Sequence, residues 1–284
     1  NKGIKNAKTN LLNHENMIYF NFPKNKKTYI CSGETIKLSK TKNLDNDKYY
    51  IISNTNDNIN VFGIRAFDSK RSTNYPWGKI PRQYFIVPST ILKITPKSAT
   101  LNINTIIDKK NSKENIIKQI QEKINQALIK KDEKNTDSII YKNKKTYPDK
   151  KHYMKMFASA VNIINNTDIQ KIVLSKMESN NFTGNQNINN ITHIMENMYK
   201  NCFNYVIKLN NNDFFLGSSP ENIIEIKKNK ITSNALAGTS TVKNNLNNKK
   251  EINEHSYVVK HIKNILSKYG DNVKQGKKSM LKLN

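Results

Sequence analysis

The 284-residue sequence has only two cysteines, Cys31 and Cys202, which lie far apart along the chain. Neither belongs to a Cys-x-x-Cys pair or to a Cys/His cluster, so the sequence contains no zinc site of the usual ligand spacing. Two isolated cysteines are typical of proteins kept in a reducing compartment. The cysteine content therefore argues against a disulfide-stabilised secreted protein and favours a cytoplasmic one.

Long apolar runs are also missing. No stretch approaches the roughly 20 apolar residues that a membrane-spanning helix needs. The first residues do not form the charged and then apolar segment of a secretory signal. We therefore expect a soluble protein without a membrane partner, of a length that allows one large domain or two smaller ones.

Arginine is scarce although the chain is strongly basic. Only Arg65, Arg71 and Arg82 are arginines among 48 basic residues, and the formal net charge is +26. Nucleic-acid readers rely on arginine because its planar guanidinium binds phosphates and bases through two parallel hydrogen bonds. The lysines are scattered along the chain together with Asn and Ile, which indicates a bias of composition. We interpret the charge as a solvated surface and expect no nucleic-acid partner.

The first 105 residues show short apolar or aromatic runs separated by Asn, Lys, Gly and Pro. This pattern is typical of a mostly antiparallel sheet. No candidate catalytic residue is visible in this part of the chain. The predicted strands cover residues 17–22, 27–31, 49–53, 61–67, 83–88 and 91–94.

Helical periodicity begins after residue 110. Apolar residues recur at helical spacing up to residue 128 behind a candidate Ser112 cap, and a second helix is predicted from Asp149 to about residue 166. Residues 130–148 between them are rich in Lys and Asp and are interpreted as a linker. The remaining predicted elements are a strand at 170–176, an Asn-rich loop at 181–190, a helix at 191–202 with Ile194, Met195 and Met198 inward, a strand at 205–209, and a last helix at 249–269 ended by Gly270.

The stretch 213–240 is the most informative part of the sequence. It predicts a hairpin in which 214–217 lead into a turn at 218–221, 222–226 leave that turn, and 229–233 return to 235–239. Glu221 follows a proline at this strand junction, where partial burial would favour the protonated carboxyl of a working acid. A glutamate in a hairpin turn is by itself more often a solvated surface residue, because turns favour polar residues for other reasons.

Lys171 in a predicted strand, Glu221 in a turn and Glu254 on a helix are weak signals one by one, but their surrounding segments are specific together. These segments are K-I-V-L-S-K at 171–176, F-L-G-S-S-P-E at 215–221, A-L-A-G-T at 235–239 and K-E-I-N-E-H-S-Y-V-V at 250–259. In order and spacing they resemble the signature blocks of the chorismate-utilising enzymes, and most of all those of the isochorismate synthases. The resemblance covers residues 149–284.

The resemblance implies an α+β fold in which two stacked, mainly antiparallel β-sheets carry helices on their outer faces. We therefore expect residues 1–284 to form a single chorismate-binding domain. Within it, residues 1–105 would be the N-terminal sheet region and residues 149–284 the region that carries the family motifs.

The resemblance also implies a reaction. A lysine at the position of Lys171 is the general base that deprotonates water for attack on C2 of chorismate, and a glutamate at the position of Glu221 protonates the departing C4 hydroxyl. One base and one acid on opposite faces of the ring are what moving a hydroxyl from C4 to C2 requires. Burial of Lys171 in the strand would favour the neutral amine that a base needs.

The same resemblance assigns the binding residues. Glu254, in the Glu-His pair, matches a Mg²⁺ ligand, and the ion in turn binds the substrate carboxylate, consistent with the preference of a hard cation for oxygen. Ala237, Gly238 and Thr239 match the substrate-binding wall. Gly238 in particular matches the glycine whose lack of a side chain lets backbone N–H groups approach the carboxylate.

Two positions distinguish the relatives. Anthranilate synthases usually carry Gln at the position of Lys171 and use ammonia, and aminodeoxychorismate synthases place a lysine where Ala237 stands. Lys171 together with Ala237 therefore indicates water as the nucleophile and an isochorismate synthase of menaquinone or siderophore biosynthesis. A salicylate synthase, which adds a lyase step, stays an open alternative.

The sequence also departs from the family pattern. The loop after Thr239 is shorter and lacks the usual Arg-Gly, and the final family blocks, with another magnesium carboxylate and an arginine for the substrate, do not follow. We therefore expect a C-terminally truncated chain that is inactive by itself. An inactive chorismate-fold protein that binds a ligand or a partner is the second open alternative.

Overall fold

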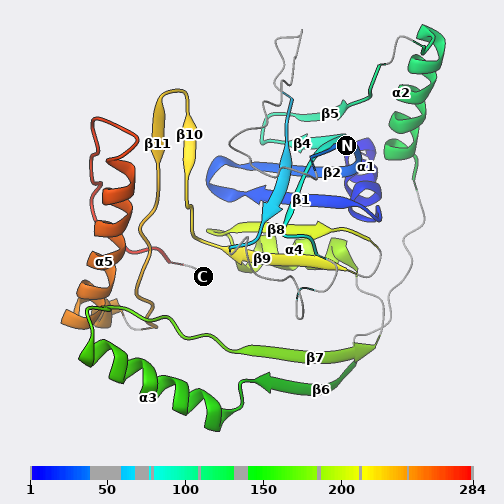
Figure 1. Cartoon of the computed structure of the whole chain (residues 1–284). Helices are drawn as coiled ribbons and strands as arrows, with labels where there is room; N and C mark the ends of the chain where they lie inside the picture. Colours follow the sequence, from blue (N-terminus) through cyan, green and yellow to red (C-terminus); the bar gives the residue numbers. More distant parts are fainter. Residues whose placement is uncertain are drawn as a thin grey trace. The chain divides into compact units, whose positions relative to one another are not determined.

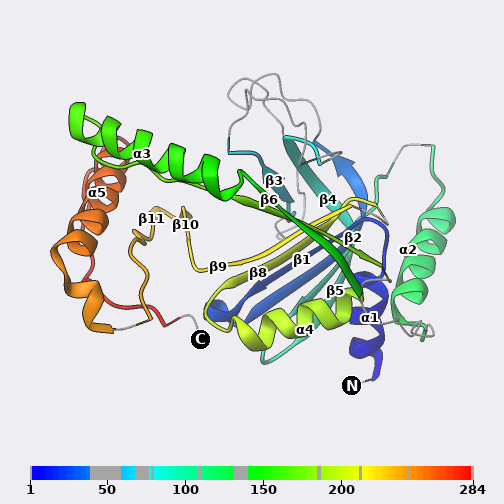
Figure 2. The same cartoon turned by 90° about the horizontal axis from the view of Figure 1, so that it is seen from below.

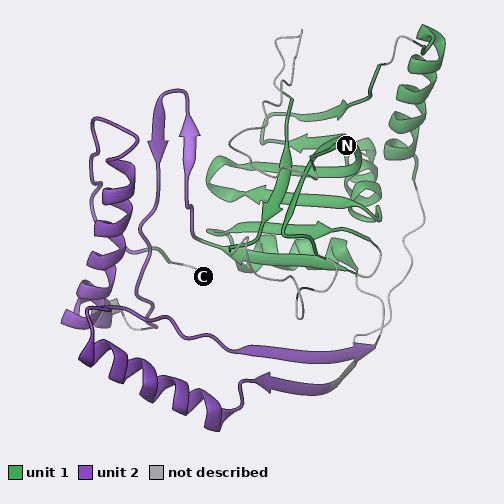
Figure 3. Ribbon diagram, viewed as in Figure 1, with its two compact units in different colours: residues 1–134, 187–220, 281–284 green, residues 135–186, 221–280 purple. Residues whose placement is uncertain are grey.

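The computed structural model describes residues 2–38, 59–67, 77, 80–107, 110–130, 140–183, 187–210, 213–241 and 243–282. The chain divides into two compact units (Figure 3). Unit 1 comprises Asn1–Lys134, Asn187–Pro220 and Leu281–Asn284, and unit 2 comprises Asn135–Gln186 and Glu221–Met280. The mixture of helices with antiparallel strands confirms the α+β prediction.

Unit 1 is built on an antiparallel sheet, which has seven strands in the described part of the chain (Figure 1). The strand order is β3-β4-β2-β1-β8-β9, and β5 pairs with β4. The strands are β1 Met17–Phe22, β2 Lys27–Lys37, β3 Phe62–Arg65, β4 Gln83–Ile94, β5 Ala99–Ile103, β8 Phe203–Lys208 and β9 Phe214–Ser219.

One face of this sheet packs against two helices, α1 (Lys2–Leu12) and α4 (Ile188–Met198), as Figure 2 shows from below. Side chains alternate between the two faces along each strand, so β1 sends Tyr19 to this face and Ile18 to the other. The third helix of the unit is α2 (Lys113–Leu128). The core on the helix side consists of Ala7, Leu11, Leu12, Met17, Tyr19, Ile30, Leu92, Ile188, Met195 and Val206.

In its described residues, unit 2 has two two-stranded antiparallel sheets and the α-helices α3 and α5 (Figure 1). Its core is small, since α5 has no buried residue and Ala160 is the only buried residue of α3. The elements are β6 Ile140–Tyr147 with β7 Met177–Thr183, β10 Glu225–Lys227 with β11 Lys230–Thr232, the helices α3 Lys150–Asn166 and α5 Lys249–Leu266, and the 3₁₀ helix η2 Lys243–Asn247.

The predicted starts of α2, α3 and α5 are confirmed, and their caps are local. The hydroxyl of Ser112 accepts a hydrogen bond from the backbone N–H of Asn115, and the carboxylate of Asp149 accepts one from the N–H of His152. Both satisfy donors that a helix N-terminus leaves without an intrahelical partner. The predicted last helix also begins at residue 249, as α5 does.

The predicted strand at 170–176 is wrong. Residues 169–176 have no regular secondary structure, and the strand β7 begins only at Met177. Its partner β6 lies within the region that was interpreted as a linker. Strand formation depends on the neighbouring strand with which a segment can pair. The segments of β6 and β7 are polar, so their own sequences do not show the alternating apolar pattern that predicts a strand.

The predicted hairpin over 213–240 is confirmed in part. The segments predicted at 222–226 and 229–233 overlap the paired strands β10 and β11, whereas β9, predicted to lead into the hairpin, pairs with β8 in the large sheet (Figure 1). The predicted runs 83–88 and 91–94 form the single strand β4, and helix α1 forms in residues for which no element was predicted. The predicted strand at 49–53 lies outside the described residues.

The helix predicted at 191–202 begins and ends earlier, as α4. Met195 is buried as expected, whereas Ile194 and Met198 are 51% and 53% exposed, so their predicted inward orientation is wrong. The earlier start rotates the face that packs on the sheet, because Ile188 and Thr192 join Met195 as its buried residues. Residues 188–190, predicted as loop, form the first turn of α4.

Candidate active site

An ion pair joins two of the four sequence segments that carry candidate residues. The Nζ atom of Lys171 lies 3.0 Å from Oε1 of Glu254, and each side chain is 32% exposed. Lys171 belongs to the irregular segment between α3 and β7, and Glu254 belongs to the second turn of α5. The two residues are 83 positions apart in the sequence, so only the folded unit brings them together.

Helix α5 places several polar residues on its more covered face. The side chain of Asn248 caps the helix by accepting a hydrogen bond from the N–H of Glu251 at 2.9 Å. Steps of three and four residues then bring Glu251, Glu254, His255 and Val258 onto one side, where they are less exposed than their neighbours. This face of α5 carries the polar residues of the candidate site.

The segment 235–239 lies against this face of α5. Nε2 of His255 is 3.2 Å from the backbone oxygen of Ala235. Gly238 has a φ of +81°, and a Cβ at this position would lie 2.7 Å from Oε2 of Glu251. A residue with a side chain would be strained there both by its backbone conformation and by the carboxylate. Glycine is therefore required for the approach of this loop to the helix.

Glu221 lies beside the same loop through the β10–β11 hairpin. The backbone N–H of Asn234 donates a hydrogen bond of 3.0 Å to the carbonyl of Asn222. Glu221 and Ala235, the next residues outward on each side, therefore leave the hairpin at the same end. Glu221 is exposed. In the described part of the chain, Lys171 forms its ion pair with Glu254 and not with Glu221.

The burial expected for Lys171 is absent. The predicted strand does not form, and of the following residues Ile172 and Leu174 are partly covered whereas Val173 is exposed. The ammonium of Lys171 instead has a carboxylate partner. In this arrangement the Nζ atom of Lys171 has to leave Glu254 before it can reach an attacking water.

Glu251 is a candidate that the sequence interpretation did not identify. Its side chain is 14% exposed, less than that of Glu254, and its carboxylate lies 3.3 Å from Nζ of Lys250. The helix dipole favours an acidic residue in the first turn of any helix, so the position of Glu251 there does not by itself indicate a functional role. The signal that could have identified it is its spacing of three residues from Glu254, which places both carboxylates on one face.

The donor set of α5 fits a hard divalent cation. Within the described ranges no three His, Cys, Asp or Glu side chains gather into a ready-made metal centre. Mg²⁺ needs only one or two protein carboxylates, because it keeps water and takes further oxygen ligands from its substrate. Glu254 and Glu251 are two carboxylates of this kind on one helix face. The residues present therefore fit the expected Mg²⁺, with Glu254 shared with Lys171.

Comparison with protein families identifies one match. A family model described as chorismate-binding enzyme matches residues 8–284 of the chain. A comparison with curated proteins finds no match. The family match covers nearly the whole sequence, including the first 105 residues, for which the sequence showed no recognisable motif.

Two solved structures are similar to this chain. The menaquinone-specific isochorismate synthase MenF from Escherichia coli is 18% identical, with a TM-score of 0.73 over 91% of this chain and 60% of MenF. The putative 2,3-dihydroxybenzoate-specific isochorismate synthase DhbC from Bacillus anthracis is 17% identical, with a TM-score of 0.57 over 92% of this chain and 63% of DhbC. At this identity the likeness shows the fold, and it confirms the predicted fold class. The chain spans about three-fifths of the length of each structure that it matches.

No helix in the described ranges is long and apolar enough to span a bilayer.

Proposed function

The chain belongs to the chorismate-binding enzyme family, and on that premise we propose that it is an isochorismate synthase, which converts chorismate to isochorismate. The observation that carries the proposal is the assembly of Lys171, the 235–239 loop and the α5 carboxylates in unit 2. These segments are separated by up to 83 residues in the sequence, and each corresponds to a block of the family pattern. The structural likeness to two isochorismate synthases supports the same choice.

Water is the nucleophile that these residues favour. The lysine at position 171 can accept a proton from water, whereas the glutamine that usually stands there in anthranilate synthases cannot act as a base at neutral pH. Ala237 offers no amine that could form a covalent intermediate with the substrate ring. Water attack at C2 with loss of the C4 hydroxyl is therefore the reaction we assign.

The proton movements of this reaction are assigned to two residues. Lys171 leaves Glu254, gives up its ammonium proton to solvent and, as the neutral amine, accepts a proton from the water that attacks C2, while the two ring double bonds shift toward C4. Glu221 donates a proton to the C4 hydroxyl, which departs as water. One proton is taken up and one is released, so the net change is the transfer of a hydroxyl between two ring carbons.

The substrate carboxylate is assigned to the loop 235–239. Gly238 keeps its backbone in the left-handed region, and the family resemblance assigns the backbone N–H groups beside it to the substrate carboxylate. Ala237 and Thr239 flank it. The hydrogen bond from His255 to Ala235 holds the loop on α5.

Magnesium dependence is part of the proposal. Glu254, with Glu251 beside it, would hold the ion, which would neutralise a substrate carboxylate and orient the ring. The protein residues must in turn keep both carboxylates ionised and free of competing cations. We place the product in menaquinone or siderophore biosynthesis in the cytoplasm.

The test is incubation of the protein with chorismate and MgCl₂, followed by chromatography of the products. Isochorismate supports the proposal. Salicylate or anthranilate as the main product would assign a sister reaction of the same family. Unchanged chorismate, together with calorimetric binding of chorismate, would support the second candidate, an inactive chorismate-fold protein.

A further inference from the structure

Unit 1 contains a small polar cavity between two of its helices and two inner strands of its sheet. The cavity has a volume of about 210 Å³ and lies between the end of α1, the second half of α2 and strands β2 and β4. None of the described residues that line it is a carboxylate. Its polar lining includes His14, Ser32, Ser89, Thr90, Lys123 and Gln126. All of these residues belong to unit 1, whereas Lys171, Glu221 and Glu254 belong to unit 2.

Two buried hydroxyls open into this cavity. Ser32 and Thr90 are directly opposite each other on β2 and β4, and each residue is 6% exposed. In the ranges that the structure describes, neither side chain has a hydrogen-bond partner, and no buried polar atom that is closed off from the surface is left unsatisfied. Both hydroxyl oxygens are therefore accessible from the cavity and can donate a hydrogen bond to water or to a ligand there.

Lys123 supplies a positive charge without a counter-ion. Its Nζ donates a hydrogen bond of 2.9 Å to the carbonyl of Asn104, and within the described residues no carboxylate lies at ion-pair distance. Burial lowers the pKa of Lys123, because the charged form loses hydration and gains no opposite charge. An anion in the cavity would compensate that charge.

The carbonyl groups at the helix ends near the cavity do not explain the position of Lys123, because other residues already donate hydrogen bonds to them. A lysine near a helix C-terminus often binds the last carbonyls. Here the amide of Asn10 donates to the carbonyls of Gln126, Ala127 and Ile129, and the amide of Asn6 donates to that of Leu128. The carbonyls at the end of α2 are therefore satisfied by asparagines. The end of α1 is closed in a similar way by the backbone N–H groups of residues 13 and 14.

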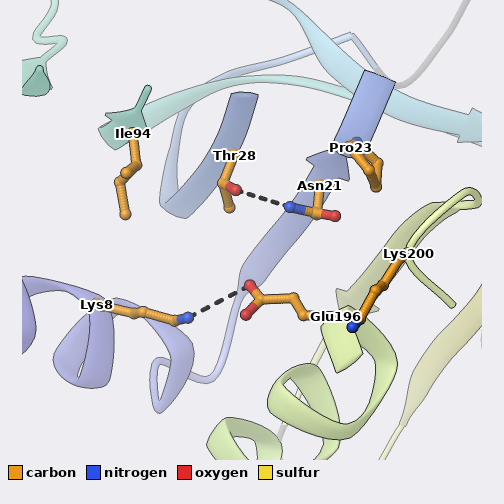
Figure 4. Close-up of a pocket in the computed structure, with 7 residues that line it drawn as sticks. All are labelled: Lys8, Asn21, Pro23, Thr28, Ile94, Glu196 and Lys200. Carbon is orange, nitrogen blue, oxygen red and sulfur yellow. Dashed lines mark hydrogen bonds and ion pairs between the residues drawn. The ribbon is translucent and has the colours of Figure 1, made fainter. Parts of the chain in front are cut away.

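A second cavity in unit 1 shows the contrast (Figure 4). It has a volume of about 430 Å³ and also contains two lysines, Lys8 and Lys200. There the protein supplies a counter-ion, because Glu196 lies 3.4 Å from Nζ of Lys8 and accepts a hydrogen bond of 2.6 Å from the hydroxyl of Tyr19. The carboxylate of Glu196 already compensates positive charge in this second cavity, so a bound anion would be less favourable there. Of these two cavities, the one at Lys123 has a cation and two hydroxyls without a protein partner, and its described lining residues include no carboxylate.

We propose that the cavity at Lys123 binds a small tetrahedral oxyanion, namely phosphate, sulfate or the phosphoryl end of a small metabolite. Lys123 provides the opposite charge, and the hydroxyls of Ser32 and Thr90 donate hydrogen bonds. The hydroxyl of Ser89 accepts one from Thr35 at 3.3 Å, so its own proton is available to the ligand. The bound anion ties α1 and α2 to strands β2 and β4. This site is separate from the proposed chorismate reaction and needs none of its residues.

The experiment is a titration of the purified protein with phosphate, sulfate and glycerol phosphate, each at ionic strength matched with NaCl. Binding is followed by calorimetry and by ³¹P line broadening, and stability by the thermal midpoint. We expect saturable one-site binding of phosphate that raises the midpoint above the NaCl control. The phosphate and glycerol phosphate arms distinguish a free anion from a phosphoryl group on a larger molecule.

Two variants and one control decide the result. Lys123→Met and the near-isosteric Thr90→Val should each weaken phosphate binding by about tenfold or more, because each removes a contact to the anion. Lys118→Met removes an exposed lysine from the same helix and should leave the affinity unchanged. Circular dichroism confirms that each variant is folded. Equal responses in all three variants, or no response beyond that to NaCl, would mean that only the +26 charge attracts anions and would overturn the proposal.

Discussion

Nζ of Lys171 and Oε1 of Glu254 lie 3.0 Å apart, so the residue assigned as the base is paired with the residue assigned to the metal. A carboxylate oxygen that accepts an ammonium is not free for a divalent cation. Binding of the proposed ion at Glu254 would therefore compete with Lys171. In the proposed mechanism the lysine also has to leave Glu254, so occupation of the metal site and release of the base would be coupled.

This competition predicts the effect of removing the lysine on metal affinity. Lys171→Met should bind Mn²⁺, used in place of Mg²⁺, about two- to fivefold more tightly, the range expected for an ion pair that is one-third exposed. Titration calorimetry and the electron paramagnetic resonance signal of free Mn²⁺ measure this without any turnover. The matched control is Lys250→Met, which removes an 81% exposed lysine paired with Glu251 and should have a smaller effect. Equal affinities for the wild type and Lys171→Met would contradict the competition.

The proton-transfer roles predict large losses of activity. Lys171→Ala and Glu221→Gln should each lower kcat for isochorismate formation by about 10²- to 10⁴-fold, the usual contribution of a general acid or base. Product formation is measured by chromatography, and hydrogen exchange checks the fold. Lys176→Ala and Glu225→Gln are controls, because these residues form exposed ion pairs with Glu178 and Lys227. Near-normal turnover in either test variant would remove that residue from the mechanism.

Gly238 predicts a local loss of stability. Gly238→Ala should destabilise the 235–239 loop and the start of α5 by about 1–2 kcal/mol, because the left-handed backbone disfavours a side chain. The new Cβ would also meet Oε2 of Glu251 at 2.7 Å. Hydrogen exchange of the α5 amides measures this change. Gly276→Ala is the control, since a Cβ there meets nothing within 4 Å. Unchanged exchange in Gly238→Ala would show that the loop is not held against α5.

The burial of the Cys31 thiol leads us to expect that the protein loses stability in mild alkali. Its thiol is fully buried in the sheet, and burial raises its pKa far above the usual range. Below the unfolded-state pKa of about 8.5 both states keep the proton, so this group does not make stability depend on pH. Above that pH the unfolded chain releases the proton and the folded chain keeps it. The free energy of unfolding should therefore fall by up to about 1.4 kcal/mol per pH unit from this group.

Urea unfolding between pH 8 and 9.5 checks this expectation. Cys31→Ala should be less stable at every pH but should lose the part of the slope that the thiol contributes. The tyrosines with raised pKa, Tyr19 and Tyr84, begin to contribute only near pH 10, so they do not mask the comparison. An identical slope in the variant would show that the Cys31 thiol ionises as easily in the folded protein as in the unfolded chain.

Local features of this protein were predictable from the sequence. The order of the four motif segments identified the family, which the family match over residues 8–284 confirms. The starts of α2 and α3 followed from Ser112 and Asp149, because an N-cap acts on N–H groups only three residues away. The face of α5 that carries Glu254 followed from helical spacing. Each of these features is decided by residues close together in the chain.

Only the tertiary structure decided which distant segments meet. It left Lys171 outside any strand, paired it with Glu254, and brought Glu251 beside Gly238. It also placed β9 beside β8 and β6 beside β7, contrary to the local pattern. The physical reason is that strand pairing and ion pairing depend on the partner that folding supplies, and a segment's own composition does not specify that partner. The sequence therefore named the residues of the candidate site, and the fold determined their contacts.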